Sequence, residues 1–92
     1  MLSLVKELCL LNGVSSGEDE VRAFIREKAA PYAEAMRTDA LGNLIVFKKG
    51  AKATGNKLML TAHMDEVGFI VNDITEDGYL KFAPVGLSLI HI

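Results

Sequence analysis

The first residues of the chain carry apolar side chains at the spacing of an amphipathic helix. Leucine, valine and cysteine recur from Leu2 to Leu11 so that they share one broad face. Asn12 and Gly13 follow, and glycine readily adopts the left-handed conformation past a helix end. The pattern therefore predicts a helix over residues 2–11 that is stopped by Gly13.

A second helix is predicted to run from a capping box to about Ala30. Ser15 and Glu18 have the spacing of the box, and the acids of residues 18–20 lie where the helix dipole favours negative charge. Pro31 ends the helix. Its buried stripe should consist of Val21, Phe24, Ile25 and Ala29.

Two hairpins are predicted in the remainder of the chain. Residues 33–38 and 44–47 flank a turn at Asp39–Asn43. Residues 69–71 and 79–82 flank a turn that contains Asp77-Gly78, a dipeptide typical of hairpins.

Between the hairpins, Leu58–Ala62 is an apolar run that follows a polar loop. A run of this length is typical of a strand buried on both faces. Two helices followed by a sheet of at least four strands indicate the α/β class, with the second face of the sheet lacking the helices that would cover it.

Polar residues follow this apolar run at its carboxyl end, where the crevice of an open α/β sheet binds ligands. His63 and Asp65 are two residues apart, so in extended backbone their side chains point to the same face. A metal site uses such a pair, since one ring nitrogen binds the metal and a carboxylate orients the ring through the other. On spacing alone a hydrogen-bonded loop anchor, or Asp65 as an N-cap, is favoured over a metal site.

Composition narrows the function classes. The 92 residues carry 10 Lys and Arg against 12 Asp and Glu, a net charge of -2, which offers no basic surface for nucleic acid or membrane. No apolar run is long enough to cross a bilayer. The single cysteine, Cys9, fits a reducing, cytoplasmic setting and is expected to be a small buried apolar residue.

Four segments carry a resemblance to a known family: Leu11–Glu18 with Val21-Arg22, Asp39–Leu44, Ala62–Phe69 and Asp77–Leu80. On these segments the chain resembles the N-terminal part of metallopeptidase family forty-two, the cytoplasmic glutamyl and deblocking aminopeptidases, some members of which carry an endoglucanase or cellulase label. The third segment is highly specific. The family pattern has a single Ser before the Gly of the first segment, where this chain has Ser15 and Ser16.

The resemblance implies a zinc-peptidase α/β/α sandwich. By that analogy residues 1–68 open the catalytic domain, and residues 69–86 begin an inserted β-rich domain. The implied activity removes N-terminal residues from peptides with two divalent metal ions, zinc or cobalt. His63 occupies the position of a metal ligand, and Asp65 that of the catalytic acid that orients it. The implied assembly is a homo-oligomer, in some members a tetrahedral dodecamer.

The chain by itself is expected to be inactive, because the family draws its other ligands and its general base from its later half. Glu66 is a poor general base, since on a strand it points away from His63 and Asp65. Two alternatives remain. One is a non-catalytic αβ assembly module whose open sheet edge pairs with another chain. The other, ranked last, is a glycosidase, which needs two facing carboxylates roughly 5 to 10 Å apart.

The last six residues, 87–92, are expected not to belong to the natural protein. The resemblance runs without a gap to Gly86 and stops there, in the middle of a domain. Residues 87–92 are mostly Leu and Ile, with no turn signal or charged group. His91 then has no functional meaning.

Overall fold

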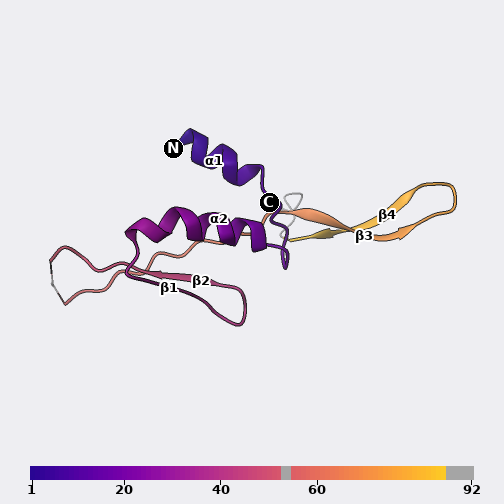
Figure 1. Ribbon diagram of the computed structural model, residues 1–92. Coiled ribbons are helices and arrows are strands. Elements are labelled where there is room, and N and C mark those ends of the chain that lie inside the picture. The colour runs from indigo at the N-terminus through magenta and orange to yellow at the C-terminus, as the bar shows by residue number, and fades with distance from the viewer. Residues whose placement is uncertain (53–54, 87–92) are drawn as a thin grey trace. The chain divides into compact units, whose positions relative to one another are not determined.

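Two helices are followed by four strands in the computed structural model of the chain, which describes residues 1–52 and 55–86 (Figure 1). The elements are α1 (Leu2–Cys9), α2 (Asp19–Ala29), the short 3-10 helix η1 (Ala30–Tyr32), β1 (Ala35–Thr38), β2 (Leu44–Phe47), β3 (Gly68–Ile74) and β4 (Leu80–Val85). Their order confirms the expected α/β class. In the described ranges no helix combines the length and the apolar character that a membrane crossing requires.

The strands form two separate antiparallel hairpins rather than one sheet. In the first, Ala35 of β1 lies opposite Phe47 of β2, and Thr38 lies opposite Leu44. In the second, β3 pairs with β4, with a register shift between Val71 and Asp73. Both hairpins confirm the expectation from their turn residues. Gly42 and Gly78 lie in the two turns and adopt positive φ angles, of 87° and 85°, which glycine accepts without steric cost.

The prediction of a buried strand over Leu58–Ala62 is wrong for this chain. The segment belongs to no strand, and the side chains of Leu58, Met59 and Leu60 are 84 to 88% exposed. A strand buried on both faces needs neighbouring strands to bind its backbone and further layers to cover it. The described strands pair only within the two hairpins, and none of them pairs with this segment.

The first helix ends earlier and by a different device than expected. Its C-cap is Leu10 in the right-handed conformation, and Gly13 is not among the residues with positive φ. Gly13 is instead a point of close packing, because a Cβ atom there would lie 2.7 Å from Cγ2 of Val21. Cys9 is exposed, which contradicts the expected burial.

The predicted capping box is also wrong. α2 begins at Asp19, and the Ser15 hydroxyl is bonded elsewhere, while Glu18 accepts a hydrogen bond from the Ser16 backbone N–H at 2.8 Å. The buried stripe is confirmed in outline. Val21 is 6% exposed and is the buried hydrophobic residue of the described ranges, while Phe24, Ile25 and Ala29 are half-buried.

The chain divides into two compact units. The first combines Met1–Val21 with Met64–Ile92, of which Gly86 is the last described residue, and the second is Arg22–His63. In the second unit Arg22 Nε donates to the carbonyl oxygen of Gly42 at 2.6 Å, which ties the helix to the turn between β1 and β2. The expected domain boundary at residues 68/69 remains a prediction.

Candidate functional site

Two segments that are far apart in the sequence meet in the first unit. The Glu66 backbone N–H donates to the carbonyl oxygen of Gly13 at 2.7 Å. Val14 and Glu66 form an isolated parallel bridge. The segment before α2 therefore lies against the residues that follow His63, and two of the four segments that carry the family resemblance are brought together.

Asp65 lies at the centre of this junction. The Ser15 hydroxyl donates to Oδ2 of Asp65 at 2.5 Å, across 50 residues of sequence, and the contact is partly buried. A carboxylate has two oxygens and about four acceptor positions, so this bond leaves Asp65 able to accept from other groups as well. Asp65 is thus a hydrogen-bonded anchor, and that structural role is compatible with orienting a histidine ring.

Three glycines lie where the two segments approach each other closely. A Cβ atom at Gly13 would lie 3.7 Å from the carbonyl oxygen of Met64, besides its contact with Val21, and one at Gly68 would meet the side chain of Val14. At Gly86 a Cβ atom would lie 3.4 Å from the carbonyl oxygen of Glu66 and 3.5 Å from Oγ of Ser15. The backbone around Asp65 is consequently packed at three points where a larger residue would contact it.

A tight turn presents Ser15 to Asp65. The Gly17 backbone N–H donates to the carbonyl oxygen of Val14 at 2.8 Å, which closes the turn. Ser16 has a φ angle of 70°, a left-handed conformation that is uncommon for a residue with a side chain. The backbone thus bends sharply directly after Ser15.

Sequence reasoning assigned Ser15 to a helix cap and missed this contact. A capping box with Ser15 at its start would have put Gly17 inside the first helical turn, where glycine is unfavourable. That glycine was the available signal that the helix begins later and that the Ser15 hydroxyl has another partner.

His63 is exposed and is the last residue of the second unit, whereas Asp65 is half-buried in the first. The division between the units falls between these two residues, and the structure tests neither proposed role. Within residues 1–52 and 55–86, no group of three or more His, Cys, Asp and Glu side chains could hold a metal ion. The other histidine, His91, lies outside the described residues, as does the whole of residues 87–92.

Asp39, in the turn between β1 and β2, is a carboxyl group whose pKa is shifted by the hydrogen bonds that it accepts. The Asn43 side chain donates to Oδ2 of Asp39, and the backbone N–H groups of Asn43 and Leu41 donate to Oδ1, at 2.9 to 3.0 Å. These hydrogen bonds, the Asn43 side chain first, hold the pKa of Asp39 below its ordinary value. Asp39 therefore stabilises a turn and is not a candidate for catalysis.

Comparison with known proteins identifies the family. Residues 42–89, which include His63 and Asp65, match the model of the M42 glutamyl aminopeptidases. The chain belongs to this family. The match extends over the first three residues of the 87–92 segment, whose origin remains untested.

Individual relatives are similar over almost the whole chain. The lysyl aminopeptidase of Pyrococcus furiosus is 37% identical over 84 residues, which are 90% of this chain and 23% of that protein. An endoglucanase from Thermotoga maritima is 47% identical, with a TM-score of 0.79 over 90% of this chain and 26% of that one. The TET aminopeptidase of a marine sediment archaeon of the Thaumarchaeota is 38% identical, with a TM-score of 0.80 over 92% of this chain and 23% of that one.

The chain is much shorter than these relatives. It spans about a quarter of the length of the curated relatives that it matches.

Proposed function

We propose that the chain is the N-terminal part of a dinuclear-metal aminopeptidase that hydrolyses N-terminal residues from peptides. The observation that carries the proposal is the match of residues 42–89 to the aminopeptidase family, because the matched stretch contains both residues of the His63–Asp65 pair. Relatives of about four times its length support the view that the complete protein is longer.

His63, which is exposed, would contribute an imidazole nitrogen to a metal ion. Asp65 would accept a hydrogen bond from the other ring nitrogen and so fix the tautomer and orientation of the ring. Two divalent ions, zinc or cobalt, would supply Lewis acidity at such a site, which activates a water molecule and polarises the carbonyl group of the substrate.

The described residues fit only part of such a site. A structural or catalytic zinc site takes three or four protein ligands, and no cluster of that size exists in the described ranges. The remaining ligands and the general base would have to be supplied by residues outside them. The chain alone should therefore be inactive.

Zinc binding tests this incompleteness directly. Calorimetric titration of zinc into the 92-residue chain should show no tight site, because one imidazole cannot hold the ion against water without further ligands. His63→Ala should titrate like the unchanged chain. A sub-micromolar site that His63→Ala removes would contradict the expectation and show that the chain completes a site by itself.

The proposed activity is tested on the longer protein. The 92-residue chain and the complete coding sequence that contains it should be assayed on a panel of aminoacyl-nitroanilides with added zinc or cobalt. The complete protein should release nitroaniline, and its His63→Ala variant should not. Inactivity of the complete protein on every N-terminal residue would overturn the proposal.

A glycosidase is the second candidate, and the similarity to the Thermotoga maritima endoglucanase is the observation that favours it. Glycoside hydrolysis needs two facing carboxylates, roughly 5 to 10 Å apart. Asp65, the acid at the junction, accepts a hydrogen bond at Oδ2 from the Ser15 hydroxyl and not from a second carboxyl group. Release of reducing sugar from cellulose by the complete protein, without release of nitroaniline, would favour this candidate over the peptidase.

The remaining proposals concern assembly and location. Similarity to a TET aminopeptidase supports a homo-oligomer in the complete protein, and the tetrahedral dodecamer is its proposed form. A purely structural assembly module is the alternative, and it predicts that His63→Ala leaves assembly and cellular function unchanged. Peptide substrates are proposed from the match to the aminopeptidase family. A cytoplasmic location and the absence of nucleic-acid and membrane partners are proposed from the composition of the chain.

A further inference from the structure

Ser15 is the side chain that is hydrogen-bonded to Asp65. Ser15 Oγ lies 2.5 Å from Oδ2 of Asp65, and the contact is partly buried. A hydrogen bond to a carboxylate is stronger than one between neutral groups, and it fixes the orientation of the acceptor. Ser15 is itself half-buried, so solvent competes less for its hydroxyl than it would at an exposed position.

The backbone on both sides of this contact is also fixed. The Glu66 N–H bonded to Gly13 and the bridge between Val14 and Glu66 hold the two segments in register, one residue away from Ser15 and Asp65. The turn closed by Gly17 and Val14 fixes the backbone of Ser15. The backbone thus holds Ser15 beside Asp65, and the hydroxyl donates to the carboxylate from that position.

We propose that Ser15 is a positioning residue, whose hydroxyl holds the Asp65 carboxylate in the orientation in which the carboxylate serves the ring of His63. This inference rests on the proposed function for the partnership of Asp65 with His63, since the structure describes the two residues in different units. The bond between Ser15 and Asp65 is independent of that function. Outer partners of metal-binding histidines contribute to metal affinity because they set the orientation and basicity of the ring.

The experiment is a double-mutant cycle in the complete protein, with zinc affinity measured by competition with a chelator and activity measured on its best aminoacyl-nitroanilide. Asp65→Ala should weaken zinc binding about 10- to 100-fold, as is usual for the loss of such a partner. Ser15→Ala should weaken it in the same direction, by about 10-fold at most, and lower kcat with little change in KM. Ser15→Thr, which keeps the hydroxyl, should restore both quantities.

The cycle separates positioning from a merely structural effect. In the Asp65→Ala background, Ser15→Ala should cause no further loss of zinc affinity, because the two residues act through one hydrogen bond. Ser16→Ala is the matched control, since it removes a neighbouring hydroxyl but keeps the backbone N–H of Ser16, which donates to Glu18. Thermal unfolding of every variant shows whether it is folded.

Three results would overturn the inference: full additivity of the two losses, failure of Ser15→Thr to restore affinity, or an effect of Ser16→Ala equal to that of Ser15→Ala. If the unchanged protein binds zinc through His63 but cleaves no substrate, the proposed function fails while the cycle in zinc affinity still tests Ser15. If the protein is an active peptidase and the cycle is additive, the inference about Ser15 fails alone.

Discussion

At the scale of single residues, Ser16 adopts a backbone conformation that residues with a side chain rarely adopt. Its φ of 70° lies in the left-handed region, which costs a residue with a Cβ atom roughly 1–2 kcal/mol. Glycine avoids that cost but loses about 0.5–1 kcal/mol to the greater freedom of the unfolded chain. The turn after Ser15 is therefore held by its surroundings rather than by its own preference.

We expect Ser16→Gly to stabilise the junction by a few tenths to about 1 kcal/mol, the difference between these two terms. Hydrogen exchange of the Glu66 amide, which is bonded to Gly13, reports opening of the junction and should slow. Ser3→Gly is the matched control, because Ser3 lies inside α1 and the same change there should be destabilising. Faster Glu66 exchange in Ser16→Gly would show that the left-handed turn costs the protein nothing.

Asp39 makes the turn between β1 and β2 sensitive to pH. Its folded-state pKa is lowered, chiefly by the Asn43 side chain. A lowered pKa means that the stabilising contribution is fully present above the unfolded value, near 3.8, and is lost as the pH falls through the folded value. The β1–β2 hairpin should therefore become less stable in acid, as Asp39 is protonated.

The Asn43→Ala variant tests the cause. It removes the side-chain donor but keeps the backbone N–H, so the pKa of Asp39 should rise toward its ordinary value in a carbon-detected NMR titration. Asn72→Ala, in the other hairpin, should leave the pKa of Asp39 unchanged. An unchanged pKa in Asn43→Ala would assign the shift to the backbone donors instead.

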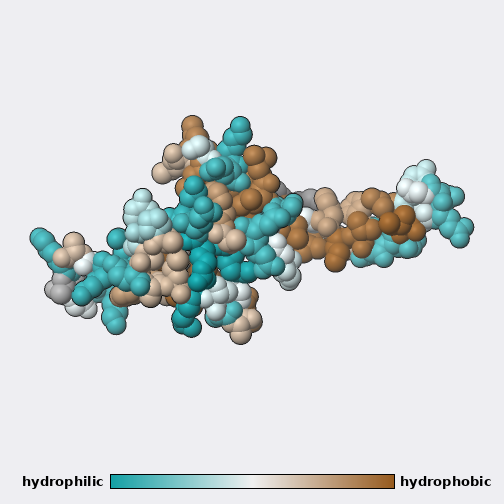
Figure 2. Space-filling model, viewed as in Figure 1, coloured by the Kyte–Doolittle hydropathy of each residue, from teal (hydrophilic) through white to brown (hydrophobic). Residues whose placement is uncertain are grey.

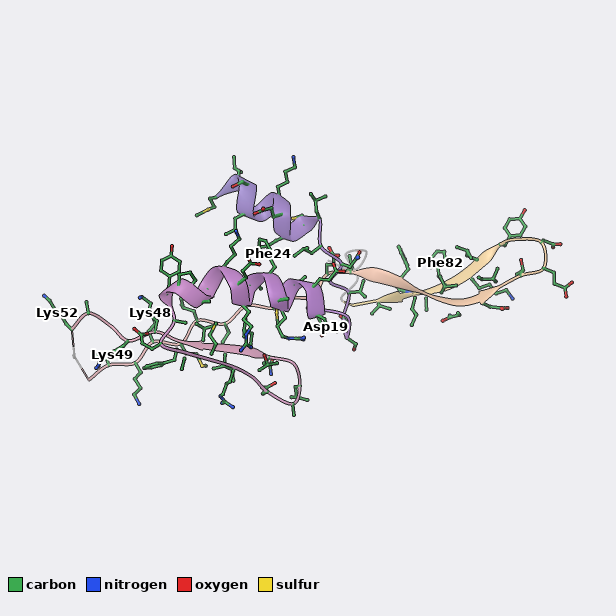
Figure 3. The ribbon with its side chains drawn as sticks, in the orientation of Figure 1. Asp19, Phe24, Lys48, Lys49, Lys52 and Phe82 are labelled. Atoms are coloured by element: carbon green, nitrogen blue, oxygen red, sulfur yellow. The ribbon has the colours of Figure 1, made fainter. Side chains whose placement is uncertain are left out.

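At the scale of elements, the start of α2 is packed directly against the segment before it. Val21, in the first turn of α2, is the buried hydrophobic residue of the described ranges, and Gly13 leaves the space that it fills. The β3–β4 hairpin contrasts with this arrangement. Phe69 and Phe82 pack edge to face with ring centroids 4.7 Å apart, but both residues are more than half exposed. Figure 3 shows Phe82 on this hairpin.

The packing of Gly13 on Val21 predicts a penalty for a single methyl group. Gly13→Ala would bring a Cβ atom to 2.7 Å from Val21 Cγ2, and such overpacking typically costs about 1–3 kcal/mol. In the Val21→Ala background the penalty should shrink, because the obstructing methyl group is gone. Exchange of the Glu66 amide measures both; equal penalties in the two backgrounds would contradict a local clash.

At the scale of the whole molecule, each of the two units exposes large hydrophobic side chains. Leu58, Met59 and Leu60 in the second unit are 84 to 88% exposed. Figure 2 shows hydrophobic surface along the β3–β4 hairpin, where Phe69, Ile70, Val71 and Phe82 are each more than half exposed. Exposed apolar surface on this scale marks an interaction site or a tendency to associate.

We therefore expect the isolated 92-residue chain to associate. Sedimentation velocity should show species larger than a monomer, with a weight-average sedimentation coefficient that rises with concentration. Replacing Leu58 and Leu60 together by Asp should reduce the association, while Lys52→Asp, on the polar loop, should not. A compact monomer that unfolds cooperatively would contradict the expectation.

The sequence by itself determined the parts of the molecule that depend on neighbours in the chain. Both hairpins and both helices follow from turn residues and periodicity, because each hairpin turn is closed by residues within it, such as Asp39 with Asn43 and Gly78 with Thr75. The candidate pair His63 and Asp65 was likewise visible, as two polar residues two apart at the end of an apolar run.

Only the tertiary structure decided the partners of residues far apart in the chain. The Ser15 hydroxyl could cap a helix or reach another segment, and sequence spacing favoured the cap; the junction with Asp65 is formed across 50 residues, by backbone pairing that no local pattern encodes. Gly13 is required by packing on Val21 rather than by a helix end. Leu58–Ala62 has the composition of a buried strand, but a strand exists only where another strand binds its backbone, and no described strand pairs with this segment.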